Sequence, residues 1–124
     1  MNRQTVCQTD PELFVRRLFD CIDGGDWPGL SDFLHDEAVY ARPGYSPFVG
    51  KQAIMNFYLE KRIVSSGQHV VEKVLSDGAN IACWGNFSGT DKKGCGIAAG
   101  FADVYCIREG RIHSRRTFFD SPAI

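Results

Sequence analysis

The chain has 124 residues, 44% of them apolar, and a formal net charge of −1 at pH 7. This length and composition predict one domain with an ordinary apolar core and leave no room for a second domain. Because 14 basic residues nearly balance 15 acidic ones, the charge excludes the strong field that attracts a nucleic acid or an anionic membrane.

The apolar runs and the cysteines indicate the cellular compartment. No run approaches the roughly 20 apolar residues that cross a bilayer, and the polar residues 1–12 contain no signal-like apolar block. We therefore expect a cytoplasmic protein whose residues 1–9 are flexible. The cysteines are odd in number and never spaced as Cys-x-x-Cys, which predicts that they are reduced and mainly buried. They are Cys7, Cys21, Cys83, Cys95 and Cys106.

Two helix patterns occupy the start of the chain. Asp10-Pro11-Glu12 predicts a helix start, because Asp accepts hydrogen bonds from free amides, Pro suits the first helical position and Glu favours the positive end of the dipole. Apolar residues then recur every four positions until Gly24-Gly25 ends the helix. Asp26 predicts the cap of a second, short helix, which we expect His35-Asp36-Glu37 to close.

A short strand and a third helix follow. Residues 38–42 are compatible with a strand that stops at Pro43-Gly44, after which residues 45–49 are expected to form a loop. From about residue 51 to residue 63 the spacing predicts a helix with Phe57-Tyr58 facing inward.

Four strand patterns fill the second half of the chain. They cover residues 68–75, 81–88, 95–107 and 111–119, and credible tight-turn signals separate them. We expect the last three strands to form a meander. Helices followed by consecutive antiparallel strands predict the α+β class rather than a parallel α/β sheet.

Four local strings resemble those of one superfamily, in the same order. Gly24-Gly25-Asp26-Trp27 is similar to its Gly-Asp break between the first two helices, and residues 33–39 resemble its F-x-x-D-A-x-V entry into the first strand. Residues 50–58 are similar to G-x-x-A-I-x-x-F-Y, and residues 101–112 resemble F-x-D-x-x-x-x-x-G-x-I.

Together the strings resemble the nuclear transport factor 2-like (NTF2-like) superfamily, which includes SnoaL-like polyketide cyclases, ketosteroid isomerases and scytalone dehydratase. The resemblance covers most of the chain and implies a single SnoaL-like domain over residues 1–124. The implied fold is a cone-shaped, curved antiparallel sheet wrapped by N-terminal helices, a cystatin-like α-β roll that encloses an apolar pocket.

The resemblance also indicates which working positions of the ketosteroid isomerases are present. Their general-base Asp precedes a Pro on the first strand, where this chain has Arg42, and their oxyanion-hole Tyr on the first helix falls at Leu18. Their protonated oxyanion-hole Asp falls at Ala102, although Asp103 stands beside it and a bulge would exchange the two faces. Only the tyrosine of the third helix is present, as Tyr58. The resemblance therefore argues against ketosteroid isomerase activity.

Strand alternation and the resemblance together predict the inward side chains. These are Tyr40 and Arg42 on the first strand, and His113, Arg115, Thr117 and Phe119 on the last. Thr117 falls at the catalytic Asp of the polyketide cyclases, so that acid or base is also lost. Two inward arginines suit a carboxylate, an enolate or a phenolate-like ligand. Alternatively, both lie at the pocket mouth and pair with acids such as Asp36 or Asp120.

The histidines are the candidates for proton transfer, because an unperturbed pKa of about 6.5 suits general acid–base catalysis. His69 opens the strand after the third helix and can reach the pocket mouth, and His113 shares the face of Arg115. His35 is expected to cap helix carbonyl groups, and a structural role is the alternative for each histidine. We expect no metal and no nucleotide cofactor, because the histidines are widely separated and the glycine-rich residues 94–100 lack the dinucleotide-loop spacing.

The outer face of the sheet is predicted to carry Trp84, Asn86, Asp103 and Tyr105. A face that bears Trp and Tyr is too apolar for free exposure, and the resemblance implies that such faces pair, so we expect a homodimer. If these residues face inward instead, they become the hydrogen-bonding groups of the pocket.

Two functions fit these expectations. The first is a cofactor-independent isomerase or dehydratase for a small, partly apolar carbonyl or carboxylate compound. His69, His113, Arg42 and Arg115 would act in catalysis, and the ligand would be held by Tyr40, Tyr58, Thr117, Phe119, Leu18, Phe57 and Ala102. The second is a non-catalytic ligand-binding or dimeric assembly module that uses the same cavity or sheet face.

Overall fold

Helix α2, Pro11–Gly24, is the first element of the computed structural model, which describes residues 10–121. Asp10 Oδ1 accepts a hydrogen bond from the amide of Leu13 at 3.0 Å and so satisfies a free donor of the first turn. At the other end Gly25 has a φ of 69°, a left-handed conformation that glycine adopts without steric cost. The predicted first helix is confirmed. Its buried face consists of Phe14, Val15, Leu18, Phe19 and Ile22.

A second cap begins the short helix α3, Trp27–Phe33, as predicted. Asp26 Oδ1 accepts a hydrogen bond from the amide of Gly29 at 3.0 Å. The chain then turns directly into strand β1, Leu34–Ala41.

Residues 35–37 lie in β1, so the prediction that they close the second helix is wrong. Leu34 is buried and pairs with Ile112 of the last strand. That buried pairing draws the residues after Leu34 into the sheet and ends the helix before them.

The predicted third helix is present in two parts. Helix α4, Lys51–Asn56, continues as the π-helical turn η1, Phe57–Lys61. In this turn the amide of Arg62 donates a hydrogen bond to the carbonyl of Phe57 at 2.9 Å. Turns of this type are rare and often lie at functional sites. Phe57 and Tyr58 are both buried, as predicted.

The strands form one curved sheet with the order β2-β1-β6-β5-β4-β3. The strands after β1 are β2 (Phe48–Val49), β3 (Val64–Asp77), β4 (Asn80–Asp91), β5 (Gly96–Arg108) and β6 (Arg111–Phe119). β3 to β6 form an antiparallel meander, which confirms and extends the predicted one. β2 lies in the segment predicted as a loop and is antiparallel to β1, whereas β1 is parallel to β6.

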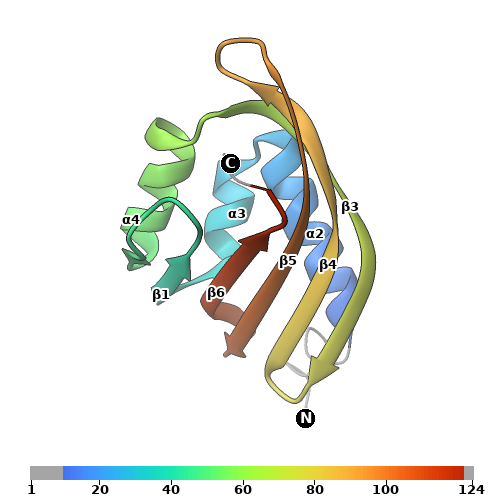
Figure 1. Ribbon diagram of the computed structural model, residues 1–124. Helices are drawn as coiled ribbons and strands as arrows, with labels where there is room; N and C mark the ends of the chain where they lie inside the picture. The colour runs from blue at the N-terminus through green and yellow to red at the C-terminus, as the bar shows by residue number, and fades with distance from the viewer. Residues whose placement is uncertain (1–9, 122–124) are drawn as a thin grey trace.

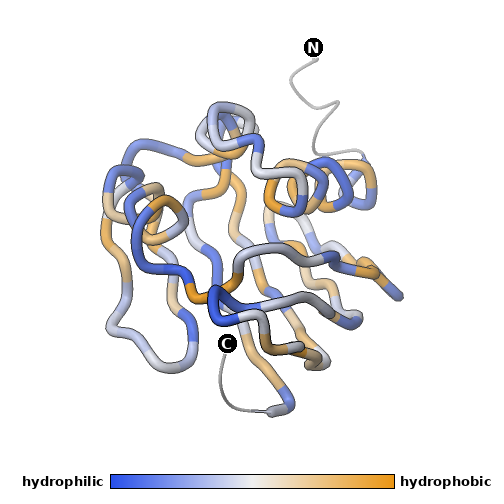
Figure 2. Tube along the Cα trace, turned by 90° about the horizontal axis from the view of Figure 1, so that it is seen from above, coloured by the Kyte–Doolittle hydropathy of each residue, from blue (hydrophilic) through white to orange (hydrophobic). Residues whose placement is uncertain are grey.

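The helices cover the concave face of the sheet (Figure 1). α2 packs against β3, and α4 packs against β1 and β2 at the opposite end of the sheet. Polar and apolar residues alternate along the strands (Figure 2), so each strand turns an apolar face toward the helices. One cluster of buried apolar side chains fills the space between the layers. The predicted α+β class and curved, helix-wrapped sheet are confirmed, with one parallel pair in a sheet expected to be antiparallel.

The described cysteines are free, but only Cys83 is fully buried. Cys21 and Cys106 are partly buried and Cys95 is exposed next to the β4–β5 turn, so the prediction of mainly buried cysteines is wrong. Cys7 and the predicted flexibility of residues 1–9 lie outside the described residues. Within residues 10–121 no helix is long and apolar enough to cross a membrane. The cytoplasmic location stays a prediction.

At Gly85 the backbone of β3 leaves no room for a side chain on β4. A Cβ atom there would lie 1.9 Å from the carbonyl oxygen of Val70, whereas a Cβ at Gly96 would meet no heavy atom within 4 Å. We expect G85A to lower the free energy of unfolding by about 1–3 kcal/mol through overpacking. The control G96A should change it by less than about 0.5 kcal/mol. Urea denaturation measures both, and equal stabilities would contradict the close approach.

Candidate active site

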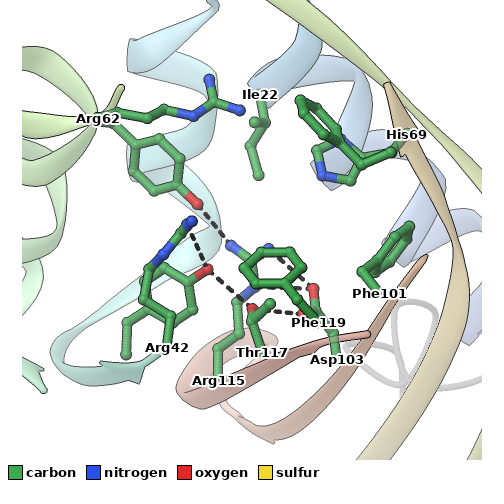
Figure 3. Close-up of a pocket in the computed structure, with 12 residues that line it drawn as sticks. Ile22, Arg42, Arg62, His69, Phe101, Asp103, Arg115, Thr117 and Phe119 are labelled. Atoms are coloured by element: carbon green, nitrogen blue, oxygen red, sulfur yellow. Dashed lines mark hydrogen bonds and ion pairs between the residues drawn. The ribbon is translucent and has the colours of Figure 1, made fainter. Parts of the chain in front are cut away.

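A cavity lies between the concave face of the sheet and the covering helices (Figure 3). The space in it that is open to water-sized spheres is about 20 Å³, which is room for about one water molecule. Most of its lining residues carry a polar group, an unusual wall for an interior cavity. They are Ile22, Tyr40, Arg42, Tyr58, Arg62, His69, Phe87, Phe101, Asp103, Arg115, Thr117 and Phe119.

An ion pair between Asp103 and Arg115 forms the floor of this cavity. Arg115 Nε and Nη2 lie 3.0 Å and 2.9 Å from Asp103 Oδ2, and the two residues are 8% and 0% exposed. Burial alone would lower the pKa of Arg115, but the Asp103 carboxylate, together with the neighbouring tyrosine hydroxyls, outweighs burial and raises the pKa well above the ordinary value. The guanidinium is therefore a permanent charge that Asp103 neutralises inside the fold.

Asp103 and Tyr105 face inward, so their predicted place on the outer sheet face is wrong. Asp103 pairs with the buried Cys83, whereas its neighbour Ala102 pairs with Trp84, which is 41% exposed. The alternation along β5 thus places Ala102 on the outer face, and it does not line the cavity. The alternative that Asp103 and Tyr105 supply hydrogen-bonding groups to the pocket region is the correct one.

The hydroxyl protons next to Asp103 have fixed directions. A carboxylate only accepts hydrogen bonds, so Tyr105 and Thr117 both donate to Asp103. Since the Thr117 proton is used in this way, the contact of 2.9 Å between Tyr40 Oη and Thr117 Oγ1 is donated by Tyr40. The Tyr40 oxygen in turn accepts from Arg42 Nη1 at 3.2 Å. The hydroxyl protons of Tyr105, Thr117 and Tyr40 are therefore all donated to protein acceptors.

Tyr58, unlike Tyr40, has a hydroxyl proton with no acceptor among the described residues. Its oxygen accepts a hydrogen bond from Arg115 Nη1 at 2.8 Å. Burial would raise the pKa of its hydroxyl, but Arg115, Arg42 and Arg62 outweigh burial and lower the pKa below the ordinary 10.0. Burial dominates at Tyr40, whose pKa rises to about 12. Tyr58 is thus the better proton donor of the two.

Arg42 lies inside the fold and not at the pocket mouth, so its predicted alternative pairing with Asp36 or Asp120 is wrong. Asp36 lies 3.8 Å from Lys51 Nζ, and Asp120 accepts from a backbone amide at 2.8 Å. Arg42 is 8% exposed, and its Nε and Nη2 have no hydrogen-bond partner within residues 10–121. Arg115 is equally buried, with Asp103 as its partner.

His69 lies in the cavity wall opposite Arg42 (Figure 3). Its Nδ1 is 2.6 Å from Asp23 Oδ1, and its backbone amide donates to Asp23 Oδ2 at 2.8 Å. The Phe19 ring stacks on the imidazole at 4.1 Å. Burial lowers the pKa of His69 below 6.5, although Asp23 acts in the opposite direction. The neutral imidazole therefore keeps its Nδ1 proton on Asp23 and leaves Nε2 free as an acceptor.

His113 is not among the lining residues, because a β-bulge changes the alternation before it reaches Arg115. The β5–β6 register leaves His113 as the extra residue, and its predicted shared face with Arg115 is wrong. Its ring lies 5.4 Å from that of His35. His35 caps no helix, since it lies in β1 and contacts Glu109 Oε1 at 3.1 Å.

The other predicted ligand contacts divide into two groups. Tyr40, Tyr58, Thr117 and Phe119 line the cavity. Leu18 and Phe57 are fully buried but are not among the residues that line the cavity. Their roles in binding stay predictions.

Three polar lining or supporting residues were missed from the sequence. Asp23 is far from its histidine partner along the chain, and no local pattern indicates the contact. Arg62 follows the third helix directly, at a position usually read as a solvated end. Asp103 had a usable signal, because Phe101 and Tyr105 lie two positions away on either side and predict a buried face.

The curved sheet, its helical cover and the polar cavity define an NTF2-like α+β domain. The model of the SnoaL-like domain family matches residues 15–115, so the chain belongs to the SnoaL-like family. No curated protein sequence matches the chain.

Solved structures with this fold are only distantly similar in sequence. A putative SnoaL-like polyketide cyclase from Jannaschia sp. CCS1 is 17% identical, with a TM-score of 0.79 and 97% of this chain and 91% of that chain covered. An LEH-like epoxide hydrolase from M. tuberculosis is 18% identical, with a TM-score of 0.74 and coverage of 86% and 79%. TerC, co-crystallised with polyporic acid, is 15% identical, with a TM-score of 0.75 and coverage of 86% and 88%. At these identities the similarity shows the fold alone.

Replacing Asp103 with Asn tests the ion pair. We expect D103N to lower the free energy of unfolding by about 3–5 kcal/mol, because Arg115 would remain buried without a counter-ion. The control D32N removes an exposed carboxylate of α3 and should cost less than about 0.5 kcal/mol. Urea denaturation compares the two, and similar costs would refute the role of the pair.

Proposed function

We propose that this SnoaL-like protein is a cofactor-independent enzyme of isomerase or dehydratase type. Its substrate is a small, partly apolar carbonyl or carboxylate compound. The observation that carries the proposal is the contact of 2.6 Å between His69 and Asp23, which leaves one neutral imidazole nitrogen as an acceptor in a wall otherwise rich in donors. The free donors of Arg42 lie on the other side of the cavity (Figure 3), and the Tyr58 hydroxyl is a further free donor in the lining.

An acceptor on one side of the cavity and donors on the other suit the removal of a proton from the carbon next to a carbonyl group. His69 Nε2 takes the proton from the carbon, and the carbonyl oxygen accepts a hydrogen bond from Tyr58 as negative charge develops on it. Arg115 donates to the Tyr58 oxygen at 2.8 Å and so strengthens Tyr58 as a donor. Asp23 holds the imidazole in one tautomer and stabilises its protonated form.

The fate of the enolate decides the reaction type. If the substrate carries a β,γ-double bond, the His69 proton returns to the γ-carbon of the dienolate, and the product is the conjugated isomer with a shifted double bond. If the substrate carries a hydroxyl group β to the carbonyl, that group leaves with the proton from His69, which gives an alkene and water. Both routes return His69 to its neutral form and need no other reactant.

The small cavity volume restricts the ligand and its entry. Space for about one water molecule means that a substrate must displace part of the wall. Arg62 and Phe119 are partly exposed lining residues next to Tyr58 and Arg42, with 5.4 Å from guanidinium to ring centre in both the Arg62–Tyr58 and the Arg42–Phe119 contact, and they are the parts of the wall that we expect to move. Apolar residues such as Phe87 and Phe101 then pack against the body of the substrate.

The enzymatic proposal is tested by proton exchange. Ligands are first selected from enones, hydroxy acids and phenolic compounds by the rise they cause in melting temperature. Incorporation of solvent deuterium next to the carbonyl is then followed by NMR. We expect H69Q to reduce the exchange rate by about 10²–10⁴-fold, the usual contribution of a general base. D23N should reduce it less.

The variant H113Q is the control, because His113 lies outside the cavity. The pH dependence supplies a second check. The neutral imidazole is the active form and its pKa lies below 6.5, so the rate should be constant through neutral pH and fall only in acid. Undiminished exchange in H69Q, or loss of exchange in H113Q, contradicts the assignment.

A second candidate is the non-catalytic or dimeric module, which the outer sheet face favours. Large apolar side chains on this face are exposed by 41–55%, namely Val70, Leu75, Trp84, Val104 and Phe118. Pairing two such faces would remove this apolar surface from water. Trp84 and Asn86 are exposed on this face and stay in the proposed homodimer contact, whereas the buried Asp103 and Tyr105 do not.

Replacing Trp84 with Glu tests the homodimer. The charge should convert a dimer into a monomer in sedimentation velocity experiments, because a carboxylate would be desolvated in the contact. The control V49E places the same charge at an exposed apolar position, 72% exposed, on β2 at the far edge of the sheet. A wild-type protein that is already monomeric, or a W84E variant that stays dimeric, rejects this contact.

A further inference from the structure

Arg42 is a buried cation whose counter-ion is missing from the described residues. Nη1 donates to Tyr40 at 3.2 Å, but Nε and Nη2 are buried and have no hydrogen-bond partner within residues 10–121. A buried charge without a partner costs free energy that folded proteins normally avoid. The side chain is only 8% exposed, so bulk water does not replace the partner.

The residues that line the cavity also carry more positive than negative charge. The lining contains the guanidinium groups of Arg42, Arg62 and Arg115 against the single carboxylate of Asp103, an excess of two positive charges. Asp103 lies against Arg115 and accepts from Thr117 and Tyr105, so it is not available to Arg42. His69 adds no positive charge at neutral pH, because burial lowers its pKa.

Aromatic rings hold the Arg42 guanidinium in place of a carboxylate. Its Cζ lies 4.8 Å from the ring centre of Phe57, 5.4 Å from Phe119, and 5.8 Å from both Tyr40 and Tyr45. Cation–π contacts stabilise the charge through the ring faces and leave the N–H donors unused. Nε and Nη2 lie on one edge of the group, and their N–H bonds form a fork that matches the two oxygens of a carboxylate.

We propose that Arg42 is the anchor for a carboxylate group of the substrate, bound through Nε and Nη2. This proposal rests on the proposed function and narrows it to a carboxylic acid with a small apolar body. The carboxylate binds Arg42, the reacting carbonyl oxygen lies at Tyr58, and the acidic C–H faces His69. A neutral carbonyl compound would leave the Arg42 fork unpaired.

The test compares benzoate with benzamide, which has nearly the same shape but no charge. Calorimetry and thermal unfolding are used on wild type, R42Q, R42K and the control R116Q, which removes an exposed arginine of β6. We expect benzoate to bind wild type and R116Q about 10- to 100-fold more tightly than R42Q, the effect of a charged hydrogen-bonded pair. R42K keeps the positive charge but lacks the pair of parallel N–H donors, so its affinity for benzoate should lie between those of wild type and R42Q. Benzamide should bind all four proteins weakly and equally.

Equal binding of benzoate and benzamide, unchanged benzoate binding in R42Q, or no binding of benzoate by the wild type overturns the proposal. The variant R42M covers the case in which R42Q does not fold. An apolar side chain of similar volume removes an uncompensated charge, so R42M should melt at or above the wild-type temperature without ligand. A clear fall in melting temperature would make Arg42 a structural cation and reject the anchor.

The variant H69Q separates this proposal from the enzymatic one. It should bind benzoate as the wild type does, because His69 lies across the cavity from Arg42 (Figure 3). Benzoate binding without any proton exchange would support a carboxylate ligand and reject the proposed reaction. Exchange on neutral ketones without benzoate binding would keep the reaction and reject the anchor.

Discussion

The buried ion pair of Asp103 and Arg115 determines how the other polar groups of the cavity are arranged. Its carboxylate accepts from Tyr105 and Thr117, and its guanidinium donates to Tyr58. Desolvation of two charges often offsets their attraction, so apolar residues of similar volume would stabilise such a core at least as well. The pair is therefore better understood as a device that orients hydrogen bonds than as a source of stability.

The Asp103 carboxylate sets the direction of several successive hydrogen bonds, up to the Arg42 side chain in the cavity wall. Because Thr117 must donate to Asp103, Tyr40 must donate to Thr117, and the Tyr40 oxygen is left to accept from Arg42. Without a carboxylate at the end, the hydroxyl groups could turn in either direction. The result is a cavity with donors on one side and the His69 nitrogen as acceptor on the other, in a medium that strengthens both.

The sequence was sufficient for the fold because its signals are local or ordered. The caps at Asp10 and Asp26 and the turn-separated strands appear where they were predicted. Which side chains enter the site depends on the alternation of inward and outward residues along the long strands. This alternation could be predicted only in part. One bulge removes His113 from the face of Arg115. In β5 the inward face was predicted to carry Ala102, whereas it carries Asp103. The pairing of His69 with Asp23 has no local signature at all.

Two residues that line the cavity come from the π-helical turn η1 or directly follow it, and this turn is not part of the sheet that carries the ion pair. Tyr58 lies in η1 and Arg62 directly follows it, and the Arg62 guanidinium is 5.4 Å from the Tyr58 ring centre. A π-turn holds one more residue than an α-turn, so the loss of one residue here would be absorbed by a return to α-helical geometry, and the segments on either side would keep their places. Neither the ion pair nor the long strands would need to change. The length of this turn therefore determines which of its side chains line the cavity, while the sheet that carries the ion pair stays the same.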